Sequence, residues 1–486
     1  MLKKTKIVAT VSDLRCSVDF IRELHESGMD VVRINSAHVT TESATQVVKN
    51  VREVSDRIAI LIDTKGPELR ITGMAGAWIN GIPVELNEIV RLKGTGKGTP
   101  SSKDVIYVTD ADLYDEVFIG AVVLIDDGEI ELEVIDKKSN MLICRANNSG
   151  TIKGKKSVNI PNVKTNLPSL TGKDVEFIHW AVDMNLDFIA HSFVRKKEDV
   201  LKVQRILDER DSHIKIISKI ENQEGVDNID EILDVTYGVM VARGDLGVEL
   251  PAEEIPIAQR SLVNKCIASK KPVIIATQML HSMILSPRPT RAEVSDIANA
   301  IYQRVDAIML SGETASGNYP VEAVQTMARI ARKIESDTRP MADIEMVRIN
   351  NEITAQLSRS AVRASINLDV KAILFDSLTG RTGRYLAAFR SRKPVYAVCY
   401  HKYVVRELAL SYGIEAIYQK PFETHESFLG KTLQKLQKQK ALTKNDLVVV
   451  VGGNFGAAQG ASFLEIGTAD NLQRKTEHAG YKYNEP

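Results

Sequence analysis

Short apolar runs rich in β-branched residues alternate along this chain with longer stretches of helical periodicity. Each run is too short for a helix and suits a strand that is buried on both faces. We expect eight of them to be strands of one parallel sheet, at residues 6–11, 31–35, 59–63, 188–192, 215–221, 239–245, 273–278 and 307–311. Eight strand and helix units predict an α/β fold, a (β/α)8 TIM barrel, whose active site lies at the C-terminal ends of the strands.

Helices are expected between these strands, and some of them begin with favourable capping residues. Thr290 and Glu293 fit a capping box, and Pro320 suits a first helical turn. The spacing of apolar positions supports helices at residues 17–27, 41–54, 173–184, 196–207, 222–233, 253–269, 290–302 and 320–334.

One long segment interrupts the alternation. Residues 68–167 carry short alternating strands separated by turns rich in Gly, Asn and Asp, which predicts an inserted, barrel-like β domain. Because the segment follows the third strand, we expect it above the barrel mouth as a lid whose closure excludes water. The barrel itself would then comprise residues 1–67 and 168–340.

The pattern changes again after the barrel. A helix is expected over residues 349–366, and strands are expected at residues 371–375, 395–399, 415–418, 447–451 and near 463–466. Strands with helices between them predict a separate three-layer α/β domain over residues 349–486.

Composition limits which class of partner and which cell compartment we expect for this protein. Lys plus Arg and Asp plus Glu both number 63, so no net field favours nucleic acid or a membrane surface, and a small molecule is the expected partner. The apolar run after the basic start, residues 7–11, is shorter than a signal sequence, and no run reaches membrane-spanning length. The four cysteines lack metal-ligand spacing and suit reduced thiols. We therefore expect a soluble cytoplasmic protein.

Charged residues follow directly on several of the apolar runs. Lys219 and Glu221 end one strand, Asp245 ends the next, and Asp63 ends the third strand of the chain. Hard divalent cations prefer oxygen ligands, so Glu221 and Asp245 suit Mg²⁺, while Lys219 and Arg33 would hold a phosphate. The alternative for the same residues is a network of structural ion pairs, and for Arg33 a structural salt bridge at the barrel rim.

Six linked motifs make the chain resemble the pyruvate kinase family over essentially its whole length. They are DTKGPELR at residues 63–70, ISKIEN at 217–222, MVARGDLG at 240–247, ATQML at 276–280, PTRAEVSD at 289–296 and MLSGETA at 309–315. The resemblance implies an enzyme of glycolysis that transfers the phosphoryl group of phosphoenolpyruvate to ADP and yields pyruvate and ATP. It also implies a homotetramer in the cytoplasm. The tetramer rests on the resemblance alone, because nothing in the composition indicates it.

The resemblance assigns catalytic and substrate-binding roles to individual residues. Glu221 and Asp245 would be the Mg²⁺ ligands, and Lys219 would stabilise the phosphoryl group during transfer, which agrees with a loose transition state that needs charge neutralisation. Arg33 would bind the phosphate. The carboxylate and enolate of the substrate would be held by Gly244, Asp245 and Thr277. For Thr277 the alternative is a buried threonine bonded to backbone.

Nucleotide and monovalent-cation contacts are likewise implied by the resemblance. The nucleotide would contact the segment from Asn35 to His38, and Arg70 and Lys156 at the edges of the lid. In the resemblance, a glutamate at the position of Glu68 is associated with dependence of the activity on K⁺. The K⁺ ion would be bound by Asn35, Asp63 and Thr64.

Three segments depart from the usual family pattern. Ala37 stands where the family has a serine whose hydroxyl binds K⁺, so we expect weaker or altered K⁺ activation. Residues 12–16 replace a Gly-Pro turn near the nucleotide, and residues 156–162 lack two usual glycines. Nucleotide contacts and lid geometry are therefore expected to differ, while the charged centre is intact.

A loop in the C-terminal domain is a candidate effector site. Residues 376–384 (DSLTGRTGR) follow a strand and open a helix, whose N-terminal amides can bind an anion. In the resemblance this loop corresponds to an allosteric phosphate site, which gives the domain a regulatory role. The candidates for binding a sugar phosphate are Ser377, Thr379, Arg381 and Thr382; an ordinary capped loop is the alternative.

Two other functions fit parts of the pattern. A catalytically silent relative could bind a phosphorylated metabolite and act as a regulator, which the altered segments at residues 12–16 and 36–39 favour. A different Mg²⁺-dependent barrel enzyme, such as a lyase acting on phosphoenolpyruvate, would share the charged centre. A nucleotide-binding motif separates these alternatives from a kinase.

Overall fold

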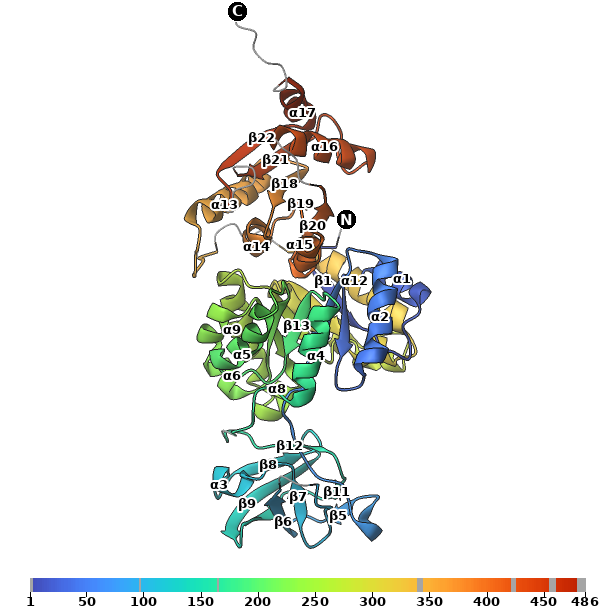
Figure 1. The fold of residues 1–486 in the computed structure, drawn as a ribbon, viewed down its shortest axis with the longest axis vertical. Helices are drawn as coiled ribbons and strands as arrows, with labels where there is room; N and C mark the ends of the chain where they lie inside the picture. Colours follow the sequence, from blue (N-terminus) through green and yellow to red (C-terminus); the bar gives the residue numbers. More distant parts are fainter. Residues whose placement is uncertain are drawn as a thin grey trace, which may run out of the picture.

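The computed structural model describes residues 3–95, 98–163, 166–338, 344–420, 425–453 and 460–478. Three bodies follow one another along its long axis, with the inserted β domain and the C-terminal domain at opposite ends of a central barrel (Figure 1). No helix in this described part of the chain is both long and apolar enough to cross a membrane.

The central body is a closed parallel barrel. Within the described ranges its eight strands run in the order β1-β17-β16-β15-β14-β13-β3-β2. Their bounds are β1 (Lys6–Thr10), β2 (Val31–Asn35), β3 (Ala59–Asp63), β13 (Phe188–His191), β14 (Lys215–Ile220), β15 (Gly238–Ala242), β16 (Val273–Ala276) and β17 (Ala307–Leu310). The predicted TIM barrel is therefore confirmed, because every expected strand is present and pairs in parallel with its neighbours.

Helices cover the outside of the barrel, as expected. They are α1 (Val18–Ser27), α2 (Thr41–Val54), α4 (Gly172–Asp183), α5 (Lys197–Asp208), α6 (Gln223–Asp227), α7 (Ile229–Val235), α9 (Ile255–Ala268), α10 (Arg291–Tyr302) and α12 (Pro320–Asp337). The capping box is present, since Thr290 Oγ1 accepts from the Glu293 backbone and Glu293 Oε2 accepts from the Thr290 backbone. Pro320 opens α12.

Two local predictions were wrong. The strand expected to reach Asp245 ends at Ala242, and Asp245 lies in the short helix α8 (Arg243–Glu249). The chain turns there because the Arg243 guanidinium bonds the Thr277 carbonyl and Asp296, and the Gly244 N–H donates to Thr277 Oγ1. The single helix expected over residues 222–233 is divided into α6 and α7 at Asn228. Two further short helices of the barrel domain are α11 (Gly312–Ala315) and η2 (His281–Ile284).

The inserted segment forms a mixed sheet with its own apolar core. Its strands are β4 (Leu69–Arg70), β5 (Ile82–Val84), β6 (Ile89–Gly94), β7 (Ile106–Val108), β8 (Val122–Ile125), β9 (Ile130–Lys138), β10 (Met141–Ala146), β11 (Gly150–Ile152) and β12 (Ser157–Asn159). The main sheet runs β4-β12-β8-β9-β10-β6-β7, and a bridge between Ile71 and Val108 brings its two ends together. The short helices η1 (Gly76–Trp78) and α3 (Leu113–Glu116) complete it.

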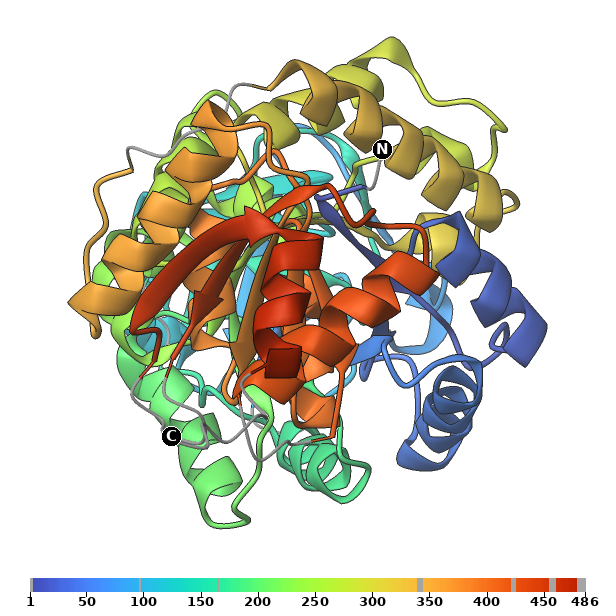
Figure 2. The ribbon, with the colours of Figure 1, turned by 90° about the horizontal axis from the view of Figure 1, so that it is seen from above.

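The C-terminal body is a three-layer α/β domain. Its sheet order is β20-β19-β18-β21-β22, with β18 (Ala372–Ser377), β19 (Val395–Cys399), β20 (Ile414–Tyr418), β21 (Leu447–Gly452) and β22 (Phe463–Thr468). Separate apolar clusters cover its two faces. Figure 2 shows α13 on one side of β22 and α16 and α17 on the other. The helices are α13 (Glu352–Asn367), α14 (Arg381–Ala388), α15 (Lys402–Glu407), η3 (Leu408–Leu410), α16 (His425–Lys438) and α17 (Ala469–His478).

Buried ion pairs join this domain to the floor of the barrel. Asp306, just before β17, receives two guanidinium nitrogens of Arg390 at 2.9 Å each. Asp187, just before β13, is bonded by Arg406 at 2.5 Å and by Arg52 at 2.9 Å. These contacts lie at the N-terminal ends of the barrel strands. The C-terminal domain is therefore attached to the end of the barrel opposite the expected active site.

Two lysines at this junction carry pKa values that make stability depend on pH. Burial, together with Arg384 and Arg348 nearby, lowers the pKa values of Lys270 and Lys271 to about 8 each, from 10.5. Lys271 Nζ donates to the Thr236 carbonyl. Between pH 8 and 10.5 these two lysines bind more protons in the unfolded chain than in the folded chain, so their contribution to the free energy of unfolding rises with pH across this window.

We expect Lys271→Gln to remove part of that rise. The slope of its free energy of unfolding against pH should be lower than that of the wild type between pH 8 and 10, by at most about 1.4 kcal/mol per pH unit. Chemical denaturation at several pH values measures the slope. The exposed Lys438→Gln, which loses the same charge, is the control. Parallel curves for Lys271→Gln and wild type would contradict the assignment.

Candidate active site

The strand register gathers four charged side chains at one end of the barrel interior. Val31, Leu61 and Ile217 point into the interior and are buried there. Since side chains alternate along a strand, the residues two positions further on, Arg33, Asp63 and Lys219, lie on the same interior face. Glu221 follows two residues after Lys219, directly beyond the end of β14.

These charges are in direct contact. Lys219 Nζ lies 3.0 Å from Asp63 Oδ1 and 2.9 Å from Glu221 Oε1. Arg33 donates from Nε to Asp63 Oδ2 at 2.7 Å and from Nη1 to Thr10 Oγ1 at 3.0 Å. The Asp63 side chain is 1% exposed and that of Lys219 is 12% exposed. The ion-pair network considered from the sequence is therefore present.

Mutual neutralisation fixes the charge of this cluster. Burial by itself raises the pKa of Asp63, but Lys219 and Arg33 outweigh it and hold that pKa below its ordinary value. Burial by itself would lower the pKa of Lys219. The negative charges of Asp63 and Glu221 outweigh burial, so the pKa of Lys219 is raised above its ordinary value. Asp63 is consequently an anion and Lys219 a cation at neutral pH.

Glu221 and Asp245 form a carboxylate pair that fits a divalent cation. Burial raises the pKa values of both carboxyls, and the Asp245 charge raises that of Glu221 further. Facing carboxylates in a buried site are costly without a cation between them. Among the described residues no three His, Cys, Asp or Glu side chains gather in a metal-binding arrangement. Glu221 and Asp245 would thus supply two oxygen ligands and leave other positions to substrate and water, as suits Mg²⁺.

Thr277 lies just beyond β16, in contact with Gly244. Its Oγ1 accepts from the Gly244 N–H at 2.8 Å and donates to the Ala276 carbonyl at 2.6 Å. Thr277 and Gln278 both have positive φ, of 70° and 55°. A threonine in the left-handed region is uncommon and is found where surrounding structure holds it for a purpose. Thr277 does bond a backbone carbonyl, as the structural alternative expects. That alternative does not account for the positive φ of Thr277.

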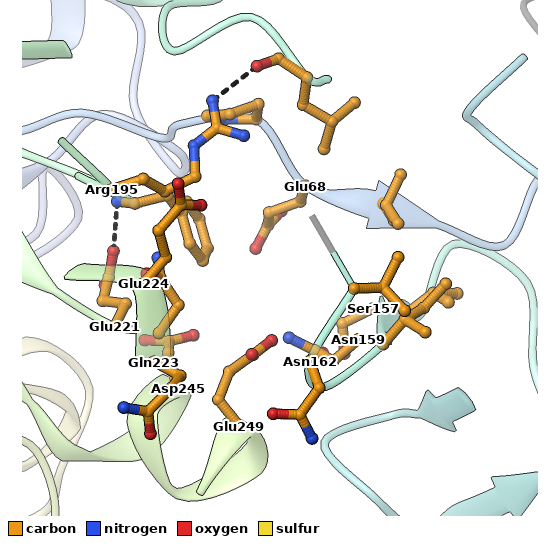
Figure 3. Close-up of a pocket in the computed structure, with 18 of the residues that line it drawn as sticks. Glu68, Ser157, Asn159, Asn162, Arg195, Glu221, Gln223, Glu224, Asp245 and Glu249 are labelled. Carbon is orange, nitrogen blue, oxygen red and sulfur yellow. Dashed lines mark hydrogen bonds between the residues drawn. The ribbon is translucent and has the colours of Figure 1, made fainter. Parts of the chain in front are cut away.

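A cleft of about 330 Å³ separates the barrel rim from the inserted domain. Figure 3 shows Glu221, Asp245 and Glu249 on the barrel side of this cleft, with Glu249 directed toward the lid. Asn159 of the lid is a hydrogen-bond partner of Glu249. Glu68, on the lid, also lines the cleft.

The residues expected to contact the nucleotide are divided between barrel and lid. Asn35 ends β2, where its Oδ1 accepts from the Ala37 N–H at 3.1 Å, and His38 is exposed. Arg70 bonds Glu68 and the Lys155 carbonyl within the lid. Lys156 Nζ lies 2.8 Å from Asp126, also in the lid. Arg70 ends β4, and Lys156 directly precedes β12, whose Ser157 pairs with Arg70.

The residues expected to bind K⁺ do lie together. Asn35 pairs in register with Asp63, and Thr64 follows Asp63 in the chain. Thr64 Oγ1 accepts from the Ser192 N–H at 3.0 Å. Both Asp63 oxygens are engaged by cationic side chains, and no described residue bonds the buried Ser36 hydroxyl.

The candidate effector loop lies at the start of α14. Ser377 Oγ accepts from the Gly380 N–H at 2.8 Å, and Gly380 has a φ of 72°. Thr382 is buried in the first turn of the helix, and Thr379 is exposed. Arg381 opens the helix. The bond between Ser377 and Gly380 is one that an ordinary capped loop would also make.

Two residues of the site were missed from the sequence. Ser192 Oγ donates to the Thr64 carbonyl at 2.6 Å and lies 2.8 Å from Lys219 Nζ. The Phe193 N–H donates to Glu221 Oε2 at 2.6 Å. The rule that found Lys219, a polar residue directly after an apolar run, also applies to Ser192; no pattern in the sequence indicates Phe193.

Comparison with known proteins places this arrangement in a family. The model for the pyruvate kinase barrel domain matches residues 2–324, and that for the pyruvate kinase alpha/beta domain matches residues 355–466. The pyruvate kinase of Borreliella burgdorferi is 45% identical over 475 residues, covering 96% of this chain and 98% of the relative. That of Bacillus licheniformis is 42% identical over 495 residues, covering 99% and 83%.

A solved structure has the same fold. The crystal structure of a pyruvate kinase from Cryptosporidium parvum superimposes with a TM-score of 0.89 at 32% sequence identity, and the match covers 96% of each chain. Both domain models match here, and the relatives align over nearly the whole chain. With its barrel, lid and C-terminal domain, and with the charged motifs assembled at one rim, this chain belongs to the pyruvate kinase family.

Proposed function

We propose that the charged rim of the barrel carries out the family's reaction, transfer of the phosphoryl group of phosphoenolpyruvate to ADP. Membership of the family supports the reaction. The observation that carries the site is the contact of Lys219 with Asp63 and Glu221 at 3.0 and 2.9 Å. This contact sets one fixed cation beside two carboxylates where parallel strands of a barrel present their catalytic ends.

Charge neutralisation is the main task of these residues. Phosphoryl transfer passes through a loose transition state, so positioning and electrostatic stabilisation provide most of the catalysis. Lys219 is held protonated by Asp63 and Glu221 and would stabilise the phosphoryl oxygens, together with Arg33. Gly244, Asp245 and the Thr277 hydroxyl would hold the carboxylate and enolate. Mg²⁺, held by Glu221 and Asp245, would neutralise further charge when bound.

ADP would be held between the barrel rim and the lid. Asn35 and His38 stand at the exit of β2, and Arg70 and Lys156 are carried by the lid. Closure of the lid would bring its two cations toward the nucleotide phosphates and exclude water from the reaction. Asn35, Asp63 and Thr64 would bind K⁺. Because Ala37 has no hydroxyl, a water molecule would take the place of the serine ligand that is usual in the family.

Regulation by an effector and assembly into a tetramer are further parts of the proposal, and likeness to the family supports them. Ser377, Thr379, Arg381 and Thr382 would bind a phosphorylated effector at the start of α14, where backbone N–H groups favour an anion. The chain would act as a homotetramer in the cytoplasm, as expected of a glycolytic enzyme. The proposed domains are the barrel of residues 1–67 and 168–340, the lid of residues 68–167 and the regulatory domain of residues 349–486.

A coupled assay for pyruvate, run with and without ADP, tests the proposed reaction. We expect turnover of phosphoenolpyruvate that strictly requires ADP and Mg²⁺. Turnover without ADP would indicate a lyase instead. A complete lack of turnover in a folded protein that still binds phosphoenolpyruvate would indicate a silent regulator.

Replacement of Lys219 tests the catalytic cation. We expect Lys219→Met to lower kcat by about 10²–10³-fold or more, because one preorganised charge is lost from the transition state. The denaturation midpoint should also fall, since Asp63 loses one of its two cations. Circular dichroism checks that the fold is kept, and Lys215→Met, at the other end of the same strand, is the control. Turnover retained by Lys219→Met would remove Lys219 from this role.

Replacement of Ala37 tests the monovalent-cation site. We expect the wild type to respond weakly to K⁺ and Ala37→Ser to respond at lower K⁺ concentration, because a hydroxyl oxygen returns to the ligand set. Activity titrated with K⁺ at constant ionic strength measures both. Coincident titration curves, with the wild type as K⁺-dependent as a serine-bearing relative, would show that Ala37 does not limit the site.

A further inference from the structure

The turn after β13 connects the hinge of the lid to the catalytic charges. Ser192 Oγ donates to the Thr64 carbonyl at 2.6 Å, and the Ser192 N–H donates to Thr64 Oγ1 at 3.0 Å. Thr64 stands two residues before Gly66, where the chain leaves β3 and enters the lid. Two exits of the barrel, from β3 and from β13, are thus joined side by side.

Phe193, the second residue of this turn, holds Glu221. Its N–H donates to Glu221 Oε2 at 2.6 Å, and Lys219 Nζ lies 2.9 Å from Glu221 Oε1. Both oxygens of this carboxylate therefore have a fixed partner. Phe193 does this with a φ of 53°, a conformation that a bulky residue rarely adopts and that surrounding contacts must maintain.

Gly66 supplies one of those contacts. A Cβ atom placed on Gly66 would lie 2.7 Å from Cδ2 of the Phe193 ring and 2.8 Å from the Ser192 Cβ, so the hinge backbone passes directly against this turn. From the other side, Asp174 Oδ1 accepts from the Lys65 N–H at 2.9 Å and from the Gly66 N–H at 3.3 Å. Asp174 is fully buried at the start of α4. The backbone at Gly66 therefore lies between the start of α4 and the Phe193 ring.

We propose that Phe193 is a positioning residue that couples the lid hinge at Gly66 to the metal-binding carboxylate of Glu221. While the hinge presses on the ring, the left-handed backbone is maintained and its N–H orients Glu221. When the hinge moves away, Phe193 is free to relax to a common backbone conformation, and Glu221 loses that hydrogen bond. Because such coupling is reciprocal, a divalent cation on Glu221 would in turn favour one hinge position.

This inference rests on the proposed role of Glu221 as an Mg²⁺ ligand. It differs from simple packing of an aromatic ring in one measurable way. If Phe193 transmits the hinge position, a change at Gly66 must alter metal affinity more strongly while the Phe193 ring is present than after the ring is removed. If the ring only fills space, changes at the two positions will alter metal affinity independently.

The test is a double-mutant cycle on metal binding in the absence of substrates. We expect Gly66→Ala to weaken Mn²⁺ binding by ~5-fold or more, the lower end of typical coupling between sites. Phe193→Gly keeps the N–H, adopts positive φ without strain and removes the ring. In that background, Gly66→Ala should weaken Mn²⁺ binding much less, because the contact with the ring is gone and only the contact with the Ser192 Cβ remains. Electron paramagnetic resonance of free Mn²⁺ measures each dissociation constant.

Two controls separate the possible outcomes. Gly413→Ala carries a similar backbone strain, with a φ of 68°, but meets only ordinary contacts, so it should leave Mn²⁺ affinity unchanged. Glu221→Gln should weaken Mn²⁺ binding. If Glu221→Gln binds Mn²⁺ as the wild type does, the proposed metal site is wrong and the coupling falls with it. If Glu221→Gln weakens binding but Gly66→Ala has no effect, or the same effect in both backgrounds, the coupling through Phe193 is wrong and the metal site stands.

Discussion

The site depends on one buried carboxylate, Asp63, and on the two cations that neutralise it. An isolated carboxylate at this depth would take up a proton, yet Lys219 and Arg33 keep it ionised. Loss of one partner from such a buried set costs about 3–5 kcal/mol, because an uncompensated charge remains. The three side chains therefore hold one another in place before substrate arrives. This preorganisation is what electrostatic catalysis requires.

The barrel provides this constraint through its register. Asn35 lies opposite Asp63, and Arg33 lies opposite Leu61, so alternation along neighbouring strands fixes which side chains meet in the interior. The opposite end of the barrel is used differently. There Asp187 and Asp306 bind arginines of the C-terminal domain. The fold thus separates a charged rim beside the inserted domain from a floor that is joined to a second domain by buried ion pairs.

Much of this could be predicted from the sequence, for a physical reason. A charged residue at the end of a strand that is buried on both faces indicates a functional or ion-paired site. This pattern predicts the placement of Asp63, Lys219 and Glu221. Asp245 was expected to end a strand, but it lies in α8, because bonds between distant residues, from Gly244 and Arg243 to Thr277, turn the chain earlier. Such contacts cannot be inferred from strand periodicity.

Phe193 could not be predicted in the same way. Its function comes from a positive φ, which sequence suggests for glycine or asparagine but not for phenylalanine, and from a neighbour that is distant in the chain. The partners of Arg70 and Lys156 in the lid were likewise unpredictable, since they depend on which lid strands pair. Charge at strand ends is therefore readable from the sequence, whereas the contacts that orient those charges are tertiary.

Anomalous diffraction from crystals grown with Mn²⁺ and phosphoenolpyruvate, without ADP, tests the central claim most directly. The account predicts a manganese peak between the carboxylates of Glu221 and Asp245, with the phosphoryl group of the substrate in contact with Lys219 and Arg33. A manganese peak elsewhere, or a substrate phosphoryl group bound away from Lys219, would contradict it.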